Sequence, residues 1–277
     1  MARWRVLIVM IAAWIAATSA IHAQAYLPEN NLAYPVQVLV AEGGGTGFFI
    51  RRGSDLFLAT ARHVLYDIAA AQPRAREFTL RALSKDLKET TVTVMHVNAA
   101  QLADSHAIRT DDQRDVAVVR LGSLRPDRLD TTPGVVVSER SRGGIIVAPF
   151  DYLTRYSEVD VSSQIFMFGY PSVGVAGFSQ IDTTRPLVRG GIVAGLNPTL
   201  KTIIIDAPVN HGNSGGPVVQ LSRTNRLRII GIATQFIPVP EDVIGQKPSD
   251  STMLALGNSG YGVVASADAI IDLINSF

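Results

Sequence analysis

The chain of 277 residues has 25 basic and 24 acidic residues, a formal net charge of +1, and no cysteine. This near-neutral balance argues against nucleic acid as the main partner, because phosphate binding needs a basic surplus. Without cysteine there is no disulfide framework, no thiolate nucleophile and no cysteine-ligated metal site. The hydrophobic fraction of 47% argues against disorder, and the length suits one all-β enzyme or two packed half-domains.

The first 25 residues have the composition of a secretory signal peptide. A basic head precedes an apolar run over residues 6–17, and an A-x-A cleavage pattern ends at Ala25. The run is shorter than the roughly 20 residues that a bilayer span needs, which favours cleavage over a retained membrane anchor. We therefore expect a periplasmic or secreted protein with no stable membrane association after cleavage. The cut removes two arginines and no acid, so the mature net charge becomes slightly negative.

The remaining chain predicts many short strands separated by Gly, Pro, Asn and Asp. Their spacing is typical of a sandwich or barrel rather than of alternating β and α units, so the expected fold class is all-β. The predicted strands are 35–40, 45–50, 56–60, 78–83, 90–96, 115–121, 135–138, 144–148, 163–168, 187–194, 202–206, 217–221, 227–235 and 261–264.

Two segments predict helices, His63–Ala71 directly after a strand and Ser266–Phe277 at the end of the chain. The second has apolar residues at helical spacing and Ser266 as its N-cap. The irregular stretch 136–160 is interpreted as the connection between two β units, 26–135 and 161–277. A further Pro-rich stretch, Ile237–Asn258, predicts a long loop whose regulatory role the sequence leaves open.

The sharpest local motif is the run from His211 to Pro217, in which Ser214 lies between glycines. Glycines allow backbone N–H groups to converge on a substrate oxygen, because no Cβ blocks its approach. A serine is a weak nucleophile without a base, so the motif needs a histidine and an orienting acid elsewhere. Taken alone, such a motif is also typical of an ordinary turn between strands.

His63 and Asp115 are the candidates for base and acid. His63 follows an apolar strand, and Asp115 opens another, where burial of its carboxylate needs a partner such as an imidazole. His96 is interpreted as an ordinary half-buried residue and His106 as part of a polar loop. The scattered histidines lack metal-ligand spacing, so neither a metal nor another cofactor is expected.

At these residues the chain resembles chymotrypsin-fold serine proteases. The segment Thr60–His63 is similar to their T-A-x-H motif, the strand opened by Asp115 to their aspartate motif, and GNSGGP around Ser214 to their serine motif. The order His, Asp, Ser also matches, and G-T-G-F at 45–48 resembles the strand before their histidine. The likeness is strongest to cysteine-free bacterial HtrA-type proteases, although no PDZ domain follows the final helix.

The resemblance implies two packed six-stranded antiparallel β-barrels with a C-terminal helix. His63 and Asp115 would come from the N-terminal barrel and Ser214 from the C-terminal one, with an acyl-enzyme as intermediate. The oxyanion hole would consist of the N–H groups of Gly212 and Ser214. Polypeptide substrates would bind by strand addition. The residues that the resemblance assigns to substrate binding are Pro208, Val209, His211, Ala233, Thr234 and Gln235.

Pro208 lies where trypsins carry an acid at the base of the pocket, so a preference for Arg or Lys is not expected. The implied specificity is a small or medium uncharged P1 side chain, although a cationic His211 would favour an acidic one. The alternative to a serine endopeptidase is a catalytically silent module that binds exported polypeptides. Substrate and oligomeric state are left open.

Overall fold

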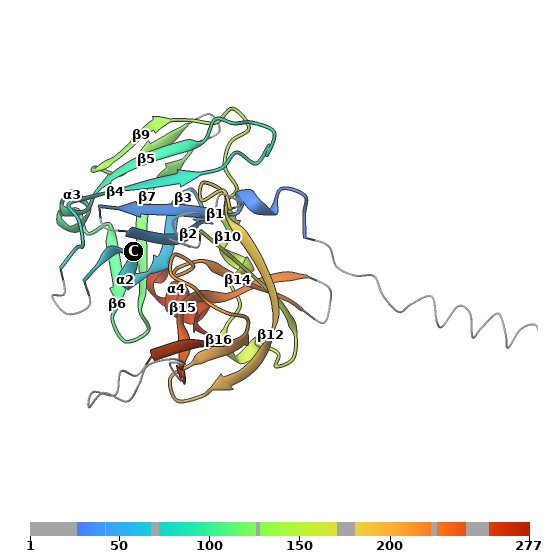
Figure 1. The fold of residues 1–277 in the computed structure, drawn as a ribbon. Helices are drawn as coiled ribbons and strands as arrows, with labels where there is room; N and C mark the ends of the chain where they lie inside the picture. The colour runs from blue at the N-terminus through green and yellow to red at the C-terminus, as the bar shows by residue number, and fades with distance from the viewer. Residues whose placement is uncertain are drawn as a thin grey trace, which may run out of the picture.

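The computed structural model describes residues 27–41, 43–67, 72–125, 128–170, 181–222, 226–241 and 255–277. Two β units lie one above the other in Figure 1, and helix α4 lies between them. Each unit is built from strands rich in Val, Ile and Phe, which suit a pleated surface with a buried face. The predicted all-β class, the two-unit architecture and the closing helix are confirmed, although only the C-terminal unit is a six-stranded barrel and the N-terminal unit is a curled ten-stranded sheet.

The N-terminal unit is a ten-stranded curled sheet with the path β6-β7-β3-β2-β1-β4-β5-β9. β10 pairs in parallel with β2, and β8 pairs with β7. The strands are β1 (Pro35–Val40), β2 (Gly43–Arg52), β3 (Asp55–Ala61), β4 (Glu77–Ala82), β5 (Thr93–Asn98), β6 (Ile108–Asp111), β7 (Val116–Leu124), β8 (Leu129–Thr131), β9 (Val135–Glu139) and β10 (Ala148–Pro149). Short helices accompany them: η1 (Asn31–Ala33), α2 (Arg62–Leu65), α3 (Ala99–Asp104), η2 (Phe150–Tyr152) and η3 (Tyr156–Glu158).

The C-terminal unit is a closed barrel in the order β11-β12-β13-β16-β15-β14. All its pairs are antiparallel, and bulges interrupt the register of three of them. Its elements are β11 (Gln164–Gly169), β12 (Leu187–Asn197), β13 (Thr202–Asp206), β14 (Pro217–Leu221), β15 (Leu227–Glu241) and β16 (Ala255–Ser266), followed by α4 (Ala267–Asn275).

Two hydrophobic cores hold the units together. One fills the barrel around residues such as Ile165 and Val264. The other fills the N-terminal sheet and continues onto the outside of the barrel through Phe168 and Val219. The apolar face of α4 joins this second core, and the helix contacts strands of both units. The relative placement of the two β units is therefore set by continuous packing, which also sets the geometry of any site between them.

Several predicted elements differ from the observed ones. The first helix ends at Leu65, because Tyr66 is extended and bridges to Pro73. The stretch 136–160, interpreted as a connection, contains most of β9 and all of β10, which pair with β5 and β2 of the first sheet. The predicted strand 135–138 agrees with β9, whereas the predicted strand 144–148 overlaps β10 only at Ala148. Ser266 precedes α4 as predicted, but its hydroxyl makes no capping bond.

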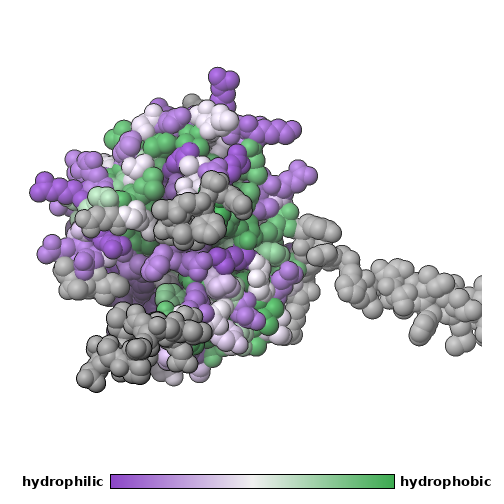
Figure 2. All heavy atoms as spheres, in the orientation of Figure 1, coloured by the Kyte–Doolittle hydropathy of each residue, from purple (hydrophilic) through white to green (hydrophobic). Residues whose placement is uncertain are grey.

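The predicted loop Ile237–Asn258 is wrong at both ends, where β15 and β16 continue as a hairpin with pairs such as Pro238↔Asn258. Residues 242–254 and the signal segment 1–25 lie outside the described residues. Within the described part, no helix has the length and apolar character to cross a membrane. Hydrophilic and apolar residues alternate over the described part of the face in Figure 2.

Candidate active site

His63 lies in the single turn of α2, directly after the buried strand β3. Its Nδ1 is 2.6 Å from Asp115 Oδ2, and its backbone N–H donates to Asp115 Oδ1 at 2.9 Å. The N–H of Arg62 donates to the Asp115 carbonyl at 3.0 Å. Three contacts from one residue thus hold the start of α2. The structure brings these predicted residues together with their side chains 25% and 19% exposed.

Asp115 has a left-handed backbone with φ 56°, immediately before β7. Only glycine adopts this region freely, although Asp and Asn tolerate it because their short polar side chains can hydrogen-bond locally. Such a conformation costs about 1–3 kcal/mol and persists where the surroundings over-determine it. Here it turns the carboxylate back toward α2 instead of along β7, which is the geometry that two hydrogen bonds to His63 require.

Ser214 lies in a tight turn between two glycines with positive φ, Gly212 at 86° and Gly215 at 83°. A Cβ at Gly215 would collide with the Thr46 carbonyl and the Thr60 hydroxyl, so the turn packs directly on β2 and β3. Thr60 is three residues before His63, and this packing therefore brings the serine turn of the barrel against the strand end that carries α2.

The backbone N–H groups of Gly212 and Ser214 have no hydrogen-bond partner among the described residues. Ser214 is half-buried, and its hydroxyl donates to the Thr234 carbonyl at 3.4 Å. Asn213 is 1% exposed, and its Oδ1 accepts a hydrogen bond from the N–H of Asn210 at 3.0 Å. Two free donors beside a half-buried hydroxyl are a suitable arrangement for binding an oxyanion.

Thr46, which the sequence analysis did not single out, organises the serine turn. Its N–H donates to the Ser214 carbonyl at 2.8 Å, and its own carbonyl accepts from the Thr60 hydroxyl at 2.6 Å. Its hydroxyl donates to the Gly212 carbonyl at 2.7 Å and accepts from the N–H of Tyr170 at 2.9 Å. Thr46 is fully buried, so these bonds are made away from water. In the sequence, only its place in the G-T-G-F strand indicates this role.

Replacing Thr46 with valine is expected to destabilise the protein while Thr46→Ser is nearly neutral. Valine keeps the shape but leaves the Gly212 carbonyl and the Tyr170 N–H unpaired in a buried place, at about 1–3 kcal/mol each. The free energy of unfolding, measured by urea titration of each variant, should fall by about 2 kcal/mol or more for valine. Equal unfolding midpoints for the two variants would show that the Thr46 hydroxyl does not stabilise the serine turn.

The six residues predicted to bind substrate occupy different environments. Val209 and Ala233 are buried in the barrel core, 2% and 0% exposed, and Pro208 is half-buried. The backbone of Ala233 accepts from Gly215 N–H at 2.7 Å and donates to Gly216 at 3.0 Å, so it supports the serine turn.

The other three predicted residues are Thr234, Gln235 and His211. The Thr234 hydroxyl donates to the Val263 carbonyl at 3.3 Å. Gln235 and His211 are exposed, and the His211 ring meets Phe236 edge-on at 6.4 Å.

Past Ala233, β15 is paired on one side only among the described strands. β14 pairs with it up to Ile232, whereas β16 continues beside it to Glu241. The free edge therefore begins next to the carbonyl that the Ser214 hydroxyl contacts. An extended peptide can add to such an edge through main-chain hydrogen bonds.

Asn258, inside the range predicted as a loop, ties β16 to this region, because its Nδ2 donates to the Val209 carbonyl at 2.8 Å. Burial raises the pKa of the Tyr170 phenol well above its ordinary value, so that group stays neutral.

The fold and the site define a chymotrypsin-like architecture with a histidine, an aspartate and a serine turn at the junction of its two units. The model of the trypsin-like peptidase domain matches residues 45–232. The chain therefore belongs to the trypsin-like peptidases, and it is a serine endopeptidase that acts on polypeptides. The predicted family resemblance is confirmed. No curated protein sequence matches the chain.

Solved structures with a similar fold include Deg5, which is 17% identical with a TM-score of 0.50 over 88% of each chain. A serine endoprotease from Yersinia pestis is 14% identical, with a TM-score of 0.48 over 91% of this chain and 67% of that one. The HtrA-type protease AlgW with tripeptide is 16% identical, with a TM-score of 0.49 over 90% of this chain and 63% of that one. At such identities the likeness concerns the fold alone.

Proposed function

We propose that the protein cleaves peptide bonds with Ser214 as nucleophile, His63 as general base and Asp115 as the residue that orients His63. The observation that carries the proposal is the paired contact of Asp115 with the His63 ring and backbone, at 2.6 and 2.9 Å. A carboxylate on Nδ1 selects the tautomer whose Nε2 is free to accept a proton.

In the proposed mechanism the Ser214 hydroxyl leaves the Thr234 carbonyl and donates to His63 Nε2. Ser214 Oγ then bonds to the substrate carbonyl carbon, while its proton passes to the imidazole. The tetrahedral oxyanion accepts hydrogen bonds from the free N–H groups of Gly212 and Ser214, each worth about 10²–10³ in rate. His63 returns the proton to the leaving amine, and water hydrolyses the acyl-enzyme by the same route.

Specificity is proposed for a small or medium uncharged P1 side chain, bound by strand addition at the free edge of β15. The proposal is supported by the uncharged character of Pro208, Val209 and Ala233. His211 is exposed and held edge-on by Phe236, which agrees better with a place at the rim than with a place in the pocket. Export to the periplasm or the cell exterior is proposed from the signal-like first 25 residues.

Incubation with a denatured, disordered protein such as casein should give internal cleavage products. Mass spectrometry of those products reads out the residue before each cut. We expect Ala, Val, Ser or Thr there most often, because larger or charged side chains lack space or a counter-charge. Cleavage mainly after Glu would instead assign the specificity to His211. Binding of the substrate without any cleavage would favour a silent binding module.

A further inference from the structure

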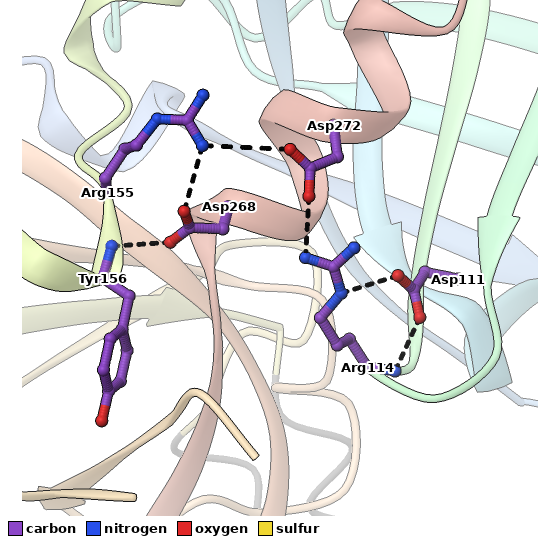
Figure 3. Close-up of polar contacts among 6 residues, drawn as sticks. All are labelled: Asp111, Arg114, Arg155, Tyr156, Asp268 and Asp272. Atoms are coloured by element: carbon purple, nitrogen blue, oxygen red, sulfur yellow. Dashed lines mark hydrogen bonds and ion pairs between the residues drawn. The ribbon is translucent and has the colours of Figure 1, made fainter. Parts of the chain in front are cut away.

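Six residues from three separate segments form one ionic cluster (Figure 3), and one of them, Arg114, directly precedes Asp115. They come from the turn between β6 and β7, from the segment at η3, and from α4. The residues of this α4 ionic cluster are Asp111, Arg114, Arg155, Tyr156, Asp268 and Asp272.

Arg114 is the centre of the cluster on the β6–β7 turn. Its Nε donates to Asp111 Oδ2 at 2.6 Å, and its backbone N–H donates to Asp111 Oδ1 at 2.9 Å. Its Nη1 donates to Asp272 Oδ2 at 3.0 Å, across 158 positions of the chain. Burial opposes its charge, but the bonds to Asp111 and Asp272 outweigh this and raise the pKa of the guanidinium. The turn is thereby tied to α4 by a permanently charged group.

The α4 side of the cluster is held rigidly. Asp268, in the first turn of the helix, accepts from the Tyr156 N–H at 2.6 Å and from Arg155 Nη1 at 3.1 Å. Ile270 and Ile274 are buried in the shared core, so the helix cannot roll without losing apolar packing. Asp272 therefore presents its carboxylate from a fixed position, although it is half exposed.

The turn that Arg114 holds is the one that ends in Asp115, the next residue. On its other flank, Asp112 forms an ion pair with the buried Arg62 at 2.7 Å, directly before His63. A left-handed aspartate depends on such neighbours, because its backbone has more favourable alternatives. Of the two anchors, only the one through Arg114 extends to the C-terminal helix.

We infer that Arg114 is a positioning residue, which uses α4 as a fixed support to hold Asp115 in the orientation that His63 needs. The inference rests on the proposed function of His63 and Asp115. It also assigns α4 a role in activity, because Arg114 couples the orientation of Asp115 to the packing of the helix. Substrate binding is not involved, so the role acts on the chemical step alone.

The test compares Arg114→Gln and Asp272→Asn with a matched control, Arg120→Gln. Arg120 lies within β7, beyond the turn, and pairs with Asp55 at 2.9 Å. In the full chain we expect Arg114→Gln to lower kcat about tenfold with KM within about twofold, since small misplacements of catalytic groups act on the chemical step. Asp272→Asn should lower kcat about threefold, and Arg120→Gln should leave it unchanged.

A pH–rate profile separates positioning from general destabilisation. A changed contact between Asp115 and the imidazolium displaces the acid limb of kcat/KM in Arg114→Gln, which a merely less stable enzyme does not do. Arg114→Lys, which keeps the charge, should recover part of the rate. Wild-type kcat and an unmoved limb in Arg114→Gln would overturn the inference, as would an equal loss in Arg120→Gln.

Two further outcomes are distinguishable. If Arg114→Gln does not fold, Asp272→Asn still decides, because it removes only the charge of a half-exposed carboxylate that contacts Arg114 at 3.0 Å and Arg155 at 3.9 Å. Unchanged kcat in a folded Asp272→Asn then overturns the role of α4. Hydrolysis at the wild-type rate by the Ser214→Ala variant would instead overturn the proposed function, and the positioning role with it.

Discussion

Ser214→Ala is expected to lower kcat by about 10⁴–10⁶ and to leave the free energy of unfolding almost unchanged. The large loss follows because the hydroxyl forms the covalent bond, and no other group takes its place at the turn. The small structural effect follows because the hydroxyl makes one long bond, 3.4 Å to the Thr234 carbonyl, at a half-buried position. Turnover of a peptide ester and urea unfolding measure the two quantities.

A fluorophosphonate probe adds a direct readout of the same assignment. It should add one phosphonyl group to the wild type, which peptide mapping places on Ser214, and none to Ser214→Ala. Ser276→Ala is the matched control, because that serine is exposed near the C-terminus and its hydroxyl donates only to the Leu273 carbonyl. Labelling of Ser214→Ala at the wild-type rate would place the nucleophile elsewhere.

Local patterns predict the strands well where one face is buried along the whole element. The predicted limits of β1, β13 and β14 agree with those observed, since apolar residues and flanking turn residues define these strands in the sequence itself. β10 is different: the sequence predicts a strand over 144–148, but only Ala148 and Pro149 pair, because they lie beside β2 in space. β-propensity disfavours proline, yet the hairpin of β15 and β16 continues through Pro238 and Pro240. These prolines are tolerated because they lie on a sheet edge, where a missing N–H donor breaks no pair.

The candidate site shows the same division between local and long-range information. His63, Asp115 and Ser214 are found by their motifs, because each lies in a characteristic local setting. Thr46 acts through bonds to Gly212 and Tyr170, 166 and 124 positions away, which no local pattern encodes. The α4 ionic cluster is equally invisible, since charged residues in a turn and on a helix normally indicate solvated positions.

Asp115→Asn is expected to lower kcat by about 10⁴, with little effect on folding. Asparagine tolerates the left-handed backbone at φ 56° and can still accept the hydrogen bond from the His63 N–H through its Oδ1. Its amide, however, donates toward His63 Nδ1, where the carboxylate accepted. The imidazole must then carry its proton on Nε2, which leaves no acceptor for the Ser214 proton.

Asp115→Ala separates this tautomer effect from the backbone effect. Alanine removes both side-chain bonds and also disfavours the left-handed conformation by about 1–2 kcal/mol. Its free energy of unfolding should therefore fall clearly below that of Asp115→Asn, while both variants lose activity to a similar extent. If the asparagine variant kept a tenth or more of the wild-type kcat, the carboxylate would be needed only to shape the turn. If it instead lost activity and stability together, the contribution of Asp115 would be structural, because a change of the His63 tautomer alone does not lower the free energy of unfolding.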